Sequence, residues 1–191
     1  MKATDTLKNE HEAVKLMMRI LDAACNNIKR ENKLQLADIE EMIDFLKVFV
    51  DQCHHGKEEQ ILFPRLETAG VPKEGGPIGV MLAEHEQGRG YIRNMNQSVV
   101  DYKAGNAAAT ASLVKNIAAY IELLEQHINK ENTVLFAMAD KLLTEEVQEE
   151  LFDKFEVLED KVIGMGKHEE LHRRLKRLST SYLDRSAHGQ H

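Results

Sequence analysis

The sequence predicts an all-α protein built around a four-helix bundle, with one or two additional helices at the C-terminal end. Good helix formers are abundant, and the 191 residues include no Trp and only three Pro. Apolar residues recur every three to four positions along four long segments. Only 5% of residues are aromatic and 30% are charged, a composition typical of helical proteins.

The first two helices are expected in the N-terminal third of the chain. The first should run from about residue 5 to about residue 27. The second should open at Asp38, with Glu41 three residues on as a capping box. Pro64 should bend or end it, because proline lacks a backbone N–H and clashes with the preceding turn. The two apolar stripes consist of Leu7, Val14, Met18, Leu21 and Cys25, and of Ile39, Ile43, Leu46, Val50 and Ile61.

The segment 68–77 holds two prolines and three glycines, so we expect it to be the main loop. A third helix should follow from about residue 78, and a fourth should follow the small-residue stretch 105–112. We expect the bundle domain to occupy residues 1–141 and a C-terminal helical appendage and tail to occupy residues 142–191.

The appendage is expected to contain helices at about residues 145–162 and 167–182. The second has a basic face that we expect to be solvated, and an apolar stripe that packs either on the bundle or on a second subunit, as in a homodimer. His168 and His172 lie one turn apart on it, either on a solvated face or as a second metal site. The apolar stripe consists of Leu171, Leu175, Leu178 and Tyr182.

Charge and hydropathy argue against two classes of partner. The net charge of -7 argues against nucleic acid, because phosphate binding depends on clustered Lys and Arg. No apolar run approaches the roughly 20 residues that span a bilayer. The N-terminal residues lack the apolar stretch of a secretory signal. We therefore expect a cytoplasmic protein with no nucleic-acid and no membrane partner.

One pattern of His, Glu and Lys occurs twice. The tripeptide E-H-E at residues 10–12 recurs at residues 84–86, and H-x-x-K-E at residues 54–58 recurs at residues 127–131. The two histidines of the first copy are 43 residues apart, and those of the second copy are 42 apart. This repeat predicts two copies of one helix pair, related by a pseudo-two-fold axis.

Six of the repeated residues form a candidate metal site. A His-x-x-x-Glu pair places both side chains on one helix face, about 6 Å apart along the axis. A single core histidine is more often a hydrogen-bonded structural residue. Here, however, four histidines and two glutamates fall on apolar stripes, and carboxylates are seldom buried unless they are paired or bind metal. The predicted ligands are His11, His54, Glu58, His85, His127 and Glu131.

His55 and Glu59 form a competing pair on the second helix. The spacing places His55 on the face of Lys47 and Asp51, which we predict to be the solvent side, so we prefer His54 and Glu58. Mixed imidazole and carboxylate ligation favours iron over zinc in a closed thiolate site. Each glutamate can bridge two metals, and six ligands shared by two irons leave positions open for a small molecule.

These motifs resemble those of the hemerythrin-like family, in particular its bacterial and archaeal members with the pattern H, HxxxE, H, HxxxE. The resemblance runs from His11 to about Phe136, through the blocks HHGKEEQILFPRLE, GGPIGVMLAEHE and QHINKENTVLF. It implies an up-down-up-down bundle with an oxo- or hydroxo-bridged pair of non-haem irons that meets O2, nitric oxide or peroxide. Iron–sulfur-centre repair proteins, a close branch, share similar blocks and usually carry an extra N-terminal segment that we do not expect here.

Oxygen-carrying members of that family have a further histidine where this chain has Arg89, and they use an Asp five residues after the fourth-helix histidine, where this chain has Asn132. We therefore expect a possible di-iron oxidoreductase that binds and reduces O2, nitric oxide or peroxide in oxidative or nitrosative stress. The alternatives are a non-catalytic carrier or sensor, and iron storage or donation for iron–sulfur cluster repair.

Three further residues near the predicted site have two interpretations each. Arg89 is a surface residue or a donor near a metal-bound anion. Gly88 permits close helix packing or leaves space for a small molecule. Tyr120 is a core residue or approaches the metals.

Overall fold

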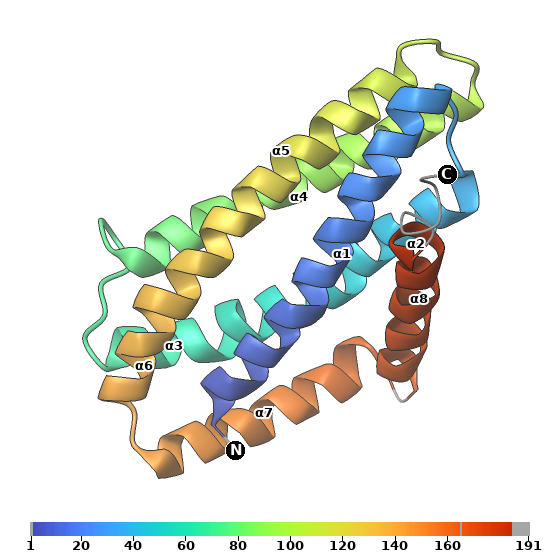
Figure 1. The fold of residues 1–191 in the computed structure, drawn as a ribbon. Coiled ribbons are helices and arrows are strands. Elements are labelled where there is room, and N and C mark those ends of the chain that lie inside the picture. The colour runs from blue at the N-terminus through green and yellow to red at the C-terminus, as the bar shows by residue number, and fades with distance from the viewer. Residues whose placement is uncertain (1, 165, 185–191) are drawn as a thin grey trace.

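The computed structural model describes residues 2–164 and 166–184, in which the regular elements are all helices. Four arms run alternately up and down and make the bundle, while two more helices lie against it (Figure 1). This confirms the predicted fold class. The first arm is α1 (Ala3–Glu31), and the second consists of α2 (Leu36–Phe45), η1 (Leu46–His55), η2 (Glu58–Leu62) and α3 (Phe63–Thr68). The third arm is α4 (Pro77–Lys103), and the fourth consists of α5 (Ala109–Lys130), η3 (Glu131–Leu135) and α6 (Phe136–Leu142). The two additional helices are α7 (Glu145–Val162) and α8 (Lys167–Tyr182).

The second and fourth arms change their helical type near the predicted ligands. The elements η1, η2 and η3 are π-helical, so their backbone hydrogen bonds join residues five apart and the turn is wider than in an α-helix. The second arm continues past Pro64 to Thr68, four residues beyond its expected end. Pro64 is tolerated because it stands in the first turn of α3, where its missing N–H costs little.

The start of the second arm also differs from the sequence prediction. It begins at Leu36, and Asp38 lies inside its first turn rather than capping it. Asp38 instead accepts hydrogen bonds from the Tyr182 hydroxyl and from Arg177, both at 3.0 Å. The predicted capping box is therefore wrong, because this carboxylate binds α8.

A buried polar layer crosses the bundle and separates two apolar clusters. On each arm, an apolar residue that precedes the predicted ligands in the sequence belongs to one cluster, and an apolar residue that follows them belongs to the other. The site is therefore enclosed by apolar packing at both ends. The flanking pairs are Leu7 and Val14, Leu62 and Val50, Met81 and Ile92, and Leu135 and Leu124.

The two C-terminal helices pack on the bundle of the same chain. Figure 1 shows α7 crossing near the beginning of α1, while α8 lies beside α2. The apolar stripe of α8 is buried there, which is one of its two predicted placements. Its basic face is only partly solvated, since Arg174 binds Asp44 at 2.9 Å and Arg177 binds Asp38 and Glu41. The predicted tail beyond residue 184 lies outside the described residues.

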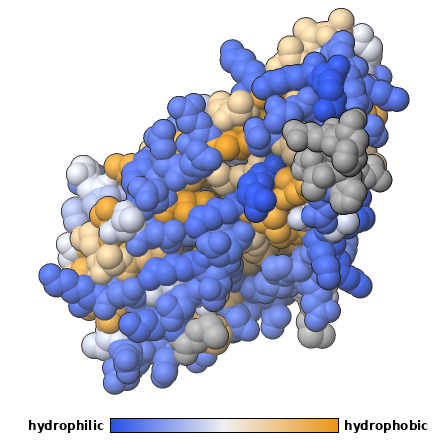
Figure 2. Space-filling view, viewed as in Figure 1, coloured by the Kyte–Doolittle hydropathy of each residue, from blue (hydrophilic) through white to orange (hydrophobic). Residues whose placement is uncertain are grey.

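The surface agrees with the composition. Hydrophilic side chains cover most of the face seen in Figure 2, and apolar ones show mainly in the grooves between helices. Among the described helices, none combines the length and the apolar character that crossing a bilayer requires.

The packing of α7 generates a stability prediction. Phe155 is fully buried in the cluster that includes Leu62 and Phe63, so Phe155→Ala should lower the free energy of unfolding by about 3–5 kcal/mol. Val157 on the same helix is 68% exposed, and Val157→Ala should change it by less than about 0.5 kcal/mol. Urea denaturation of both variants measures the difference, and equal stabilities would mean that α7 does not pack on the bundle.

Candidate metal centre

The structure brings the six predicted ligands together in the polar layer. His11 lies on α1, His54 on η1, His85 on α4 and His127 on α5, so each arm contributes one histidine. The two glutamates stand at the start of the π-helical segments η2 and η3. All six residues are at most 2% exposed. Their predicted inward orientation is therefore what the structure shows.

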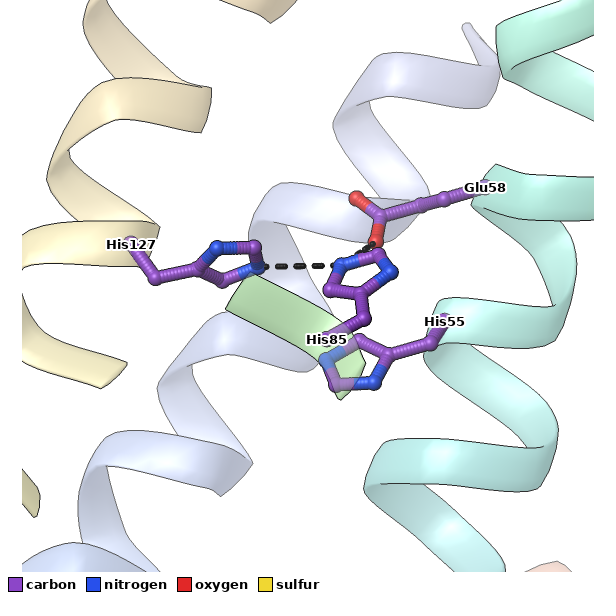
Figure 3. A group of neighbouring side chains, drawn as sticks. All are labelled: His55, Glu58, His85 and His127. Carbon is purple, nitrogen blue, oxygen red and sulfur yellow. Dashed lines mark hydrogen bonds and ion pairs between the residues drawn. The ribbon is translucent and has the colours of Figure 1, made fainter. Parts of the chain in front are cut away.

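The four imidazoles form two pairs that face each other through their Nε2 atoms. His11 Nε2 lies 3.1 Å from His54 Nε2, and His85 Nε2 lies 3.1 Å from His127 Nε2. The second pair is seen in Figure 3. Nitrogen ligands stand about 2.1 Å from a bound metal ion. Two nitrogens that bind one ion with a bond angle of about 90° are about 3 Å apart, close to the 3.1 Å found in each pair.

The two glutamates lie between these pairs. Glu131 reaches His11 through Oε2 at 3.1 Å and His127 through Oε1 at 3.0 Å. Glu58 reaches His85 at 3.4 Å and His54 at 3.8 Å, again through different oxygens. All four carboxylate oxygens are buried, and none forms a hydrogen bond of acceptable geometry with the described residues, although imidazole nitrogens lie as near as 3.0 Å. Buried carboxylate oxygens without donors are the expected ligands of a cation, so the donor set fits metal.

Charge compensation gives a second test of this fit. Burial alone would lower the pKa of His85, but the carboxylates of Glu131 and Glu58 raise it to about 11. Burial also opposes a charge on His127, yet Glu131 raises its pKa to about 9. Burial would raise the pKa of Glu131, but His127 and the other imidazoles hold it well below its usual range. Protons on imidazoles thus balance the carboxylates, and a cation can replace them because metal binding displaces ligand protons.

Each ligand imidazole is also held at its outer nitrogen, Nδ1. Such contacts fix the orientation of the ring, and carboxylate partners increase the basicity of the ligand. Three of the four partners are carboxylates. The pairs are His54 with Glu10 at 2.7 Å, His127 with Glu84 at 2.9 Å, His85 with Glu59 at 2.7 Å, and His11 with Asn132 at 3.0 Å.

These four partners were not predicted from the sequence, although the repeat contains the signal. Glu10 and Glu84 open the two E-H-E motifs, and each binds the second histidine of its own copy. Glu59 and Asn132 directly follow the two ligand glutamates, and each binds the first histidine of the other copy. The pseudo-two-fold relation therefore extends from the ligands to the residues that orient them.

The symmetry ends at the lysines behind these carboxylates. Lys57 donates to Glu10 at 2.5 Å and to Glu159 of α7 at 2.6 Å, and its side chain is fully buried. Lys130, at the equivalent place in the second copy, binds Glu84 but remains 37% exposed. The appended helix α7 therefore covers one half of the site.

His55 does not lie on the solvent side, and that prediction is wrong. It is 4% exposed, and its ring stacks on His85 with centroids 3.8 Å apart and an interplanar angle of 13°. The wide π-helical turn of η1 places both His54 and His55 in the core, which a spacing argument for an α-helix does not anticipate. Burial and the neighbouring His85 lower the pKa of His55 well below its usual range, so its imidazole is neutral.

The remaining residues with two interpretations are also placed. Arg89 is partly buried and binds Asp51 and Glu59, so it contacts an orienting carboxylate rather than the centre. A Cβ at Gly88 would stand 3.5 Å from the Tyr120 ring, which indicates close packing of α4 on α5.

In the appendage, His168 is partly exposed and binds Glu159 of α7 at 2.5 Å through Nδ1. Its Nε2 lies 2.8 Å from His172 Nε2. His168 therefore contacts the carboxylate that holds Lys57, and the exposed His172 contacts His168.

Fold and donor set together define a metal-binding helical bundle protein. The family model described as "Hemerythrin HHE cation binding domain" matches residues 2–139, which is most of the chain. The chain therefore belongs to the hemerythrin HHE family, which confirms the resemblance and supports non-haem iron as the metal. The match ends before α7, so the residues that cover Lys57 lie outside it.

Relatives of this chain among curated proteins include uncharacterized mycobacterial proteins and an iron–sulfur cluster repair protein. The uncharacterized proteins Rv1995 of Mycobacterium tuberculosis and Mb2018 of Mycobacterium bovis are each 25% identical over 162 residues, 85% of this chain and 63% of theirs. The iron-sulfur cluster repair protein YtfE of Yersinia pestis is 36% identical over 89 residues, 45% of this chain and 40% of its own. The chain thus spans about three fifths of the mycobacterial relatives. No solved structure gives a significant match.

The orienting contacts generate a prediction about metal affinity. Glu10→Gln should weaken iron binding about 10- to 100-fold, because it removes the carboxylate that holds His54 Nδ1. The matched control is Glu12→Gln two residues away, where the side chain is 72% exposed and pairs with Lys15. Competition with a coloured ferrous chelator measures both affinities. Equal affinities in the two variants would show that Glu10 does not support the metal.

Proposed function

We propose that this protein binds two non-haem irons and uses them to bind and reduce a small molecule, namely O2, nitric oxide or peroxide. The observation that carries the proposal is the two facing pairs of imidazoles, which lie beside two buried carboxylates whose oxygens form no hydrogen bond with the described residues. The proposed ligands are the six predicted from the sequence: His11, His54, Glu58, His85, His127 and Glu131.

The residues of the chain orient the ligand imidazoles, hold a proton on Nδ1 and shield the centre from water. With Nδ1–H donated to Glu10, Glu84 or Glu59, three ligand imidazoles keep the Nε2 lone pair free and directed inward. All six proposed ligands are at most 2% exposed, so bulk water has little access to the centre. When bound, a pair of ferrous ions supplies the two electrons that, with two protons from solvent, reduce one peroxide to two waters.

The charge around the centre favours reduction over reversible binding. Two carboxylates lie among the imidazoles, and three more contact them at Nδ1. Negative charge and basic ligands stabilise the more highly charged ferric ion relative to the ferrous ion. Electrons should therefore pass to the bound molecule, and a carrier or sensor of O2 or nitric oxide is the less favoured alternative.

Iron donation for cluster repair is a second candidate function, and the similarity to the YtfE repair protein favours it. That similarity covers less than half of this chain, so it supports the site rather than the whole activity. Incubation of the iron-loaded protein with an apo [4Fe–4S] protein, sulfide and reductant separates the candidates. Cluster formation faster than with the same concentration of free ferrous iron would support donation.

The iron count is the first test of the proposal. Protein produced with ample iron should contain close to two irons per chain by elemental analysis. His127→Ala should lose most of the iron and lower Tm, because it removes a ligand and leaves buried polar groups unpaired. The exposed neighbour Gln126→Ala should keep both irons. One zinc and no iron in the unmodified protein would contradict the proposal.

Reduction is tested by the reaction of the ferrous protein with air and peroxide. Air should convert it to a ferric form that vacuum does not reverse, and hydrogen peroxide should be consumed at one equivalent per two irons oxidised. Visible spectra and a peroxide electrode follow both reactions. A stable oxygenated spectrum that disappears on deoxygenation, cycle after cycle, would show that the protein carries oxygen instead.

A further inference from the structure

His55 is a fifth core histidine next to the proposed ligands. Its donor atom lies within 4.8 Å of donor atoms of Glu58, His85 and His127, and all four residues are buried. Figure 3 shows its ring lying against that of His85, with His127 facing them from another helix. Ligands on opposite sides of one metal ion are about 4.2 Å apart when each bond is about 2.1 Å. His55 becomes a ligand when its ring tilts out of the stack on His85, so that a ring nitrogen points at the ion that the four donor atoms can share.

Packing alone does not account for His55. Its Nδ1 is buried and has no hydrogen-bond partner among the described residues. The oxygen of Asp51 nearest to it is 3.6 Å away, too far for a hydrogen bond. An unpaired buried imidazole nitrogen costs about 1–3 kcal/mol, whereas an apolar ring of similar size would stack on His85 without that cost. A metal bond would give this imidazole the partner that packing does not.

The internal repeat singles out this position. His54 and His127 are equivalent, so the residue equivalent to His55 is Ile128, which is equally buried at 4% exposure. An apolar side chain thus satisfies the packing at that place in the other copy. With His55, one half of the centre has three imidazoles, while His11 and His54 form the other half.

Arg89 holds the helical turn that presents His55. Its guanidinium donates to Asp51 and to Glu59, both at 2.7 Å. These carboxylates stand four residues before and four residues after His55, on the same arm. Arg89 therefore spans the turn from α4 and holds it against His85, whose Nδ1 shares the carboxylate of Glu59.

We propose that His55 is a fifth histidine ligand, which binds the iron held by His85 and His127. This inference rests on the proposed pair of irons. It makes the two metal positions chemically different, because one has three imidazoles and the other has two.

The test uses His55→Phe, which keeps an aromatic ring against His85 but has no nitrogen donor. Its control is Ile128→Phe, which places the same phenyl ring at the equivalent and equally buried position in the other copy. Iron content, the rate of iron release into a chelator and the Mössbauer spectrum are measured on the iron-loaded chain. His55→Phe should release one of the two irons at least tenfold faster, and one of the two Mössbauer doublets should shift.

Each outcome decides between ligand and packing roles. Unchanged iron content, release rate and spectrum in a folded His55→Phe variant would overturn the inference while leaving the two-iron proposal intact. If the Phe variant does not fold, His55→Ala is used with added imidazole, and restoration of the slow release rate by imidazole supports ligation. Failure of imidazole to restore it would contradict ligation. Absence of iron in the unmodified protein would refute the proposed function itself.

Discussion

Glu58 and Glu131 place two negative charges in the middle of a bundle from which water is excluded. An uncompensated buried charge there would cost more free energy than a folded domain of this size has to spare. The facing imidazoles provide the compensation, as protonated partners or as fellow ligands of a cation. This compensation depends on the orientation of each imidazole, which the contacts at Nδ1 fix. It also depends on the distance between the four arms, which the apolar clusters on either side of the polar layer maintain.

That requirement explains why irregular helix occurs where it does. Each His-x-x-x-Glu motif adjoins a π-helical segment, and unusual turns in helices are frequent at functional sites. A wider turn weakens regular hydrogen bonding, and the packing around it has to hold it in place. On the second arm, the Arg89 contacts to Asp51 and Glu59 do this from the neighbouring helix.

Much of this arrangement is readable from the sequence. The repeat and the apolar stripes predicted four arms, two C-terminal helices and six His and Glu side chains that point inward, because 3.6-residue periodicity fixes which side chains share a face. The same rule failed at His55, since it assumes an α-helix and η1 is wider. The capping prediction also failed, because Asp38 does not cap its helix and instead accepts a hydrogen bond from Tyr182 of α8, 144 residues away in the sequence. Local patterns do not contain such distant partners.

The burial of Lys57 under α7 joins two parts of the chain thermodynamically. Its ammonium binds Glu10, which orients His54, and Glu159 of the appended helix at the same time. Whatever strengthens one contact therefore favours the other, and by linkage the coupling is reciprocal. Undocking of α7 would leave the buried ammonium of Lys57 with Glu10 alone, so the position of the C-terminal helices and the orientation of His54 are energetically coupled.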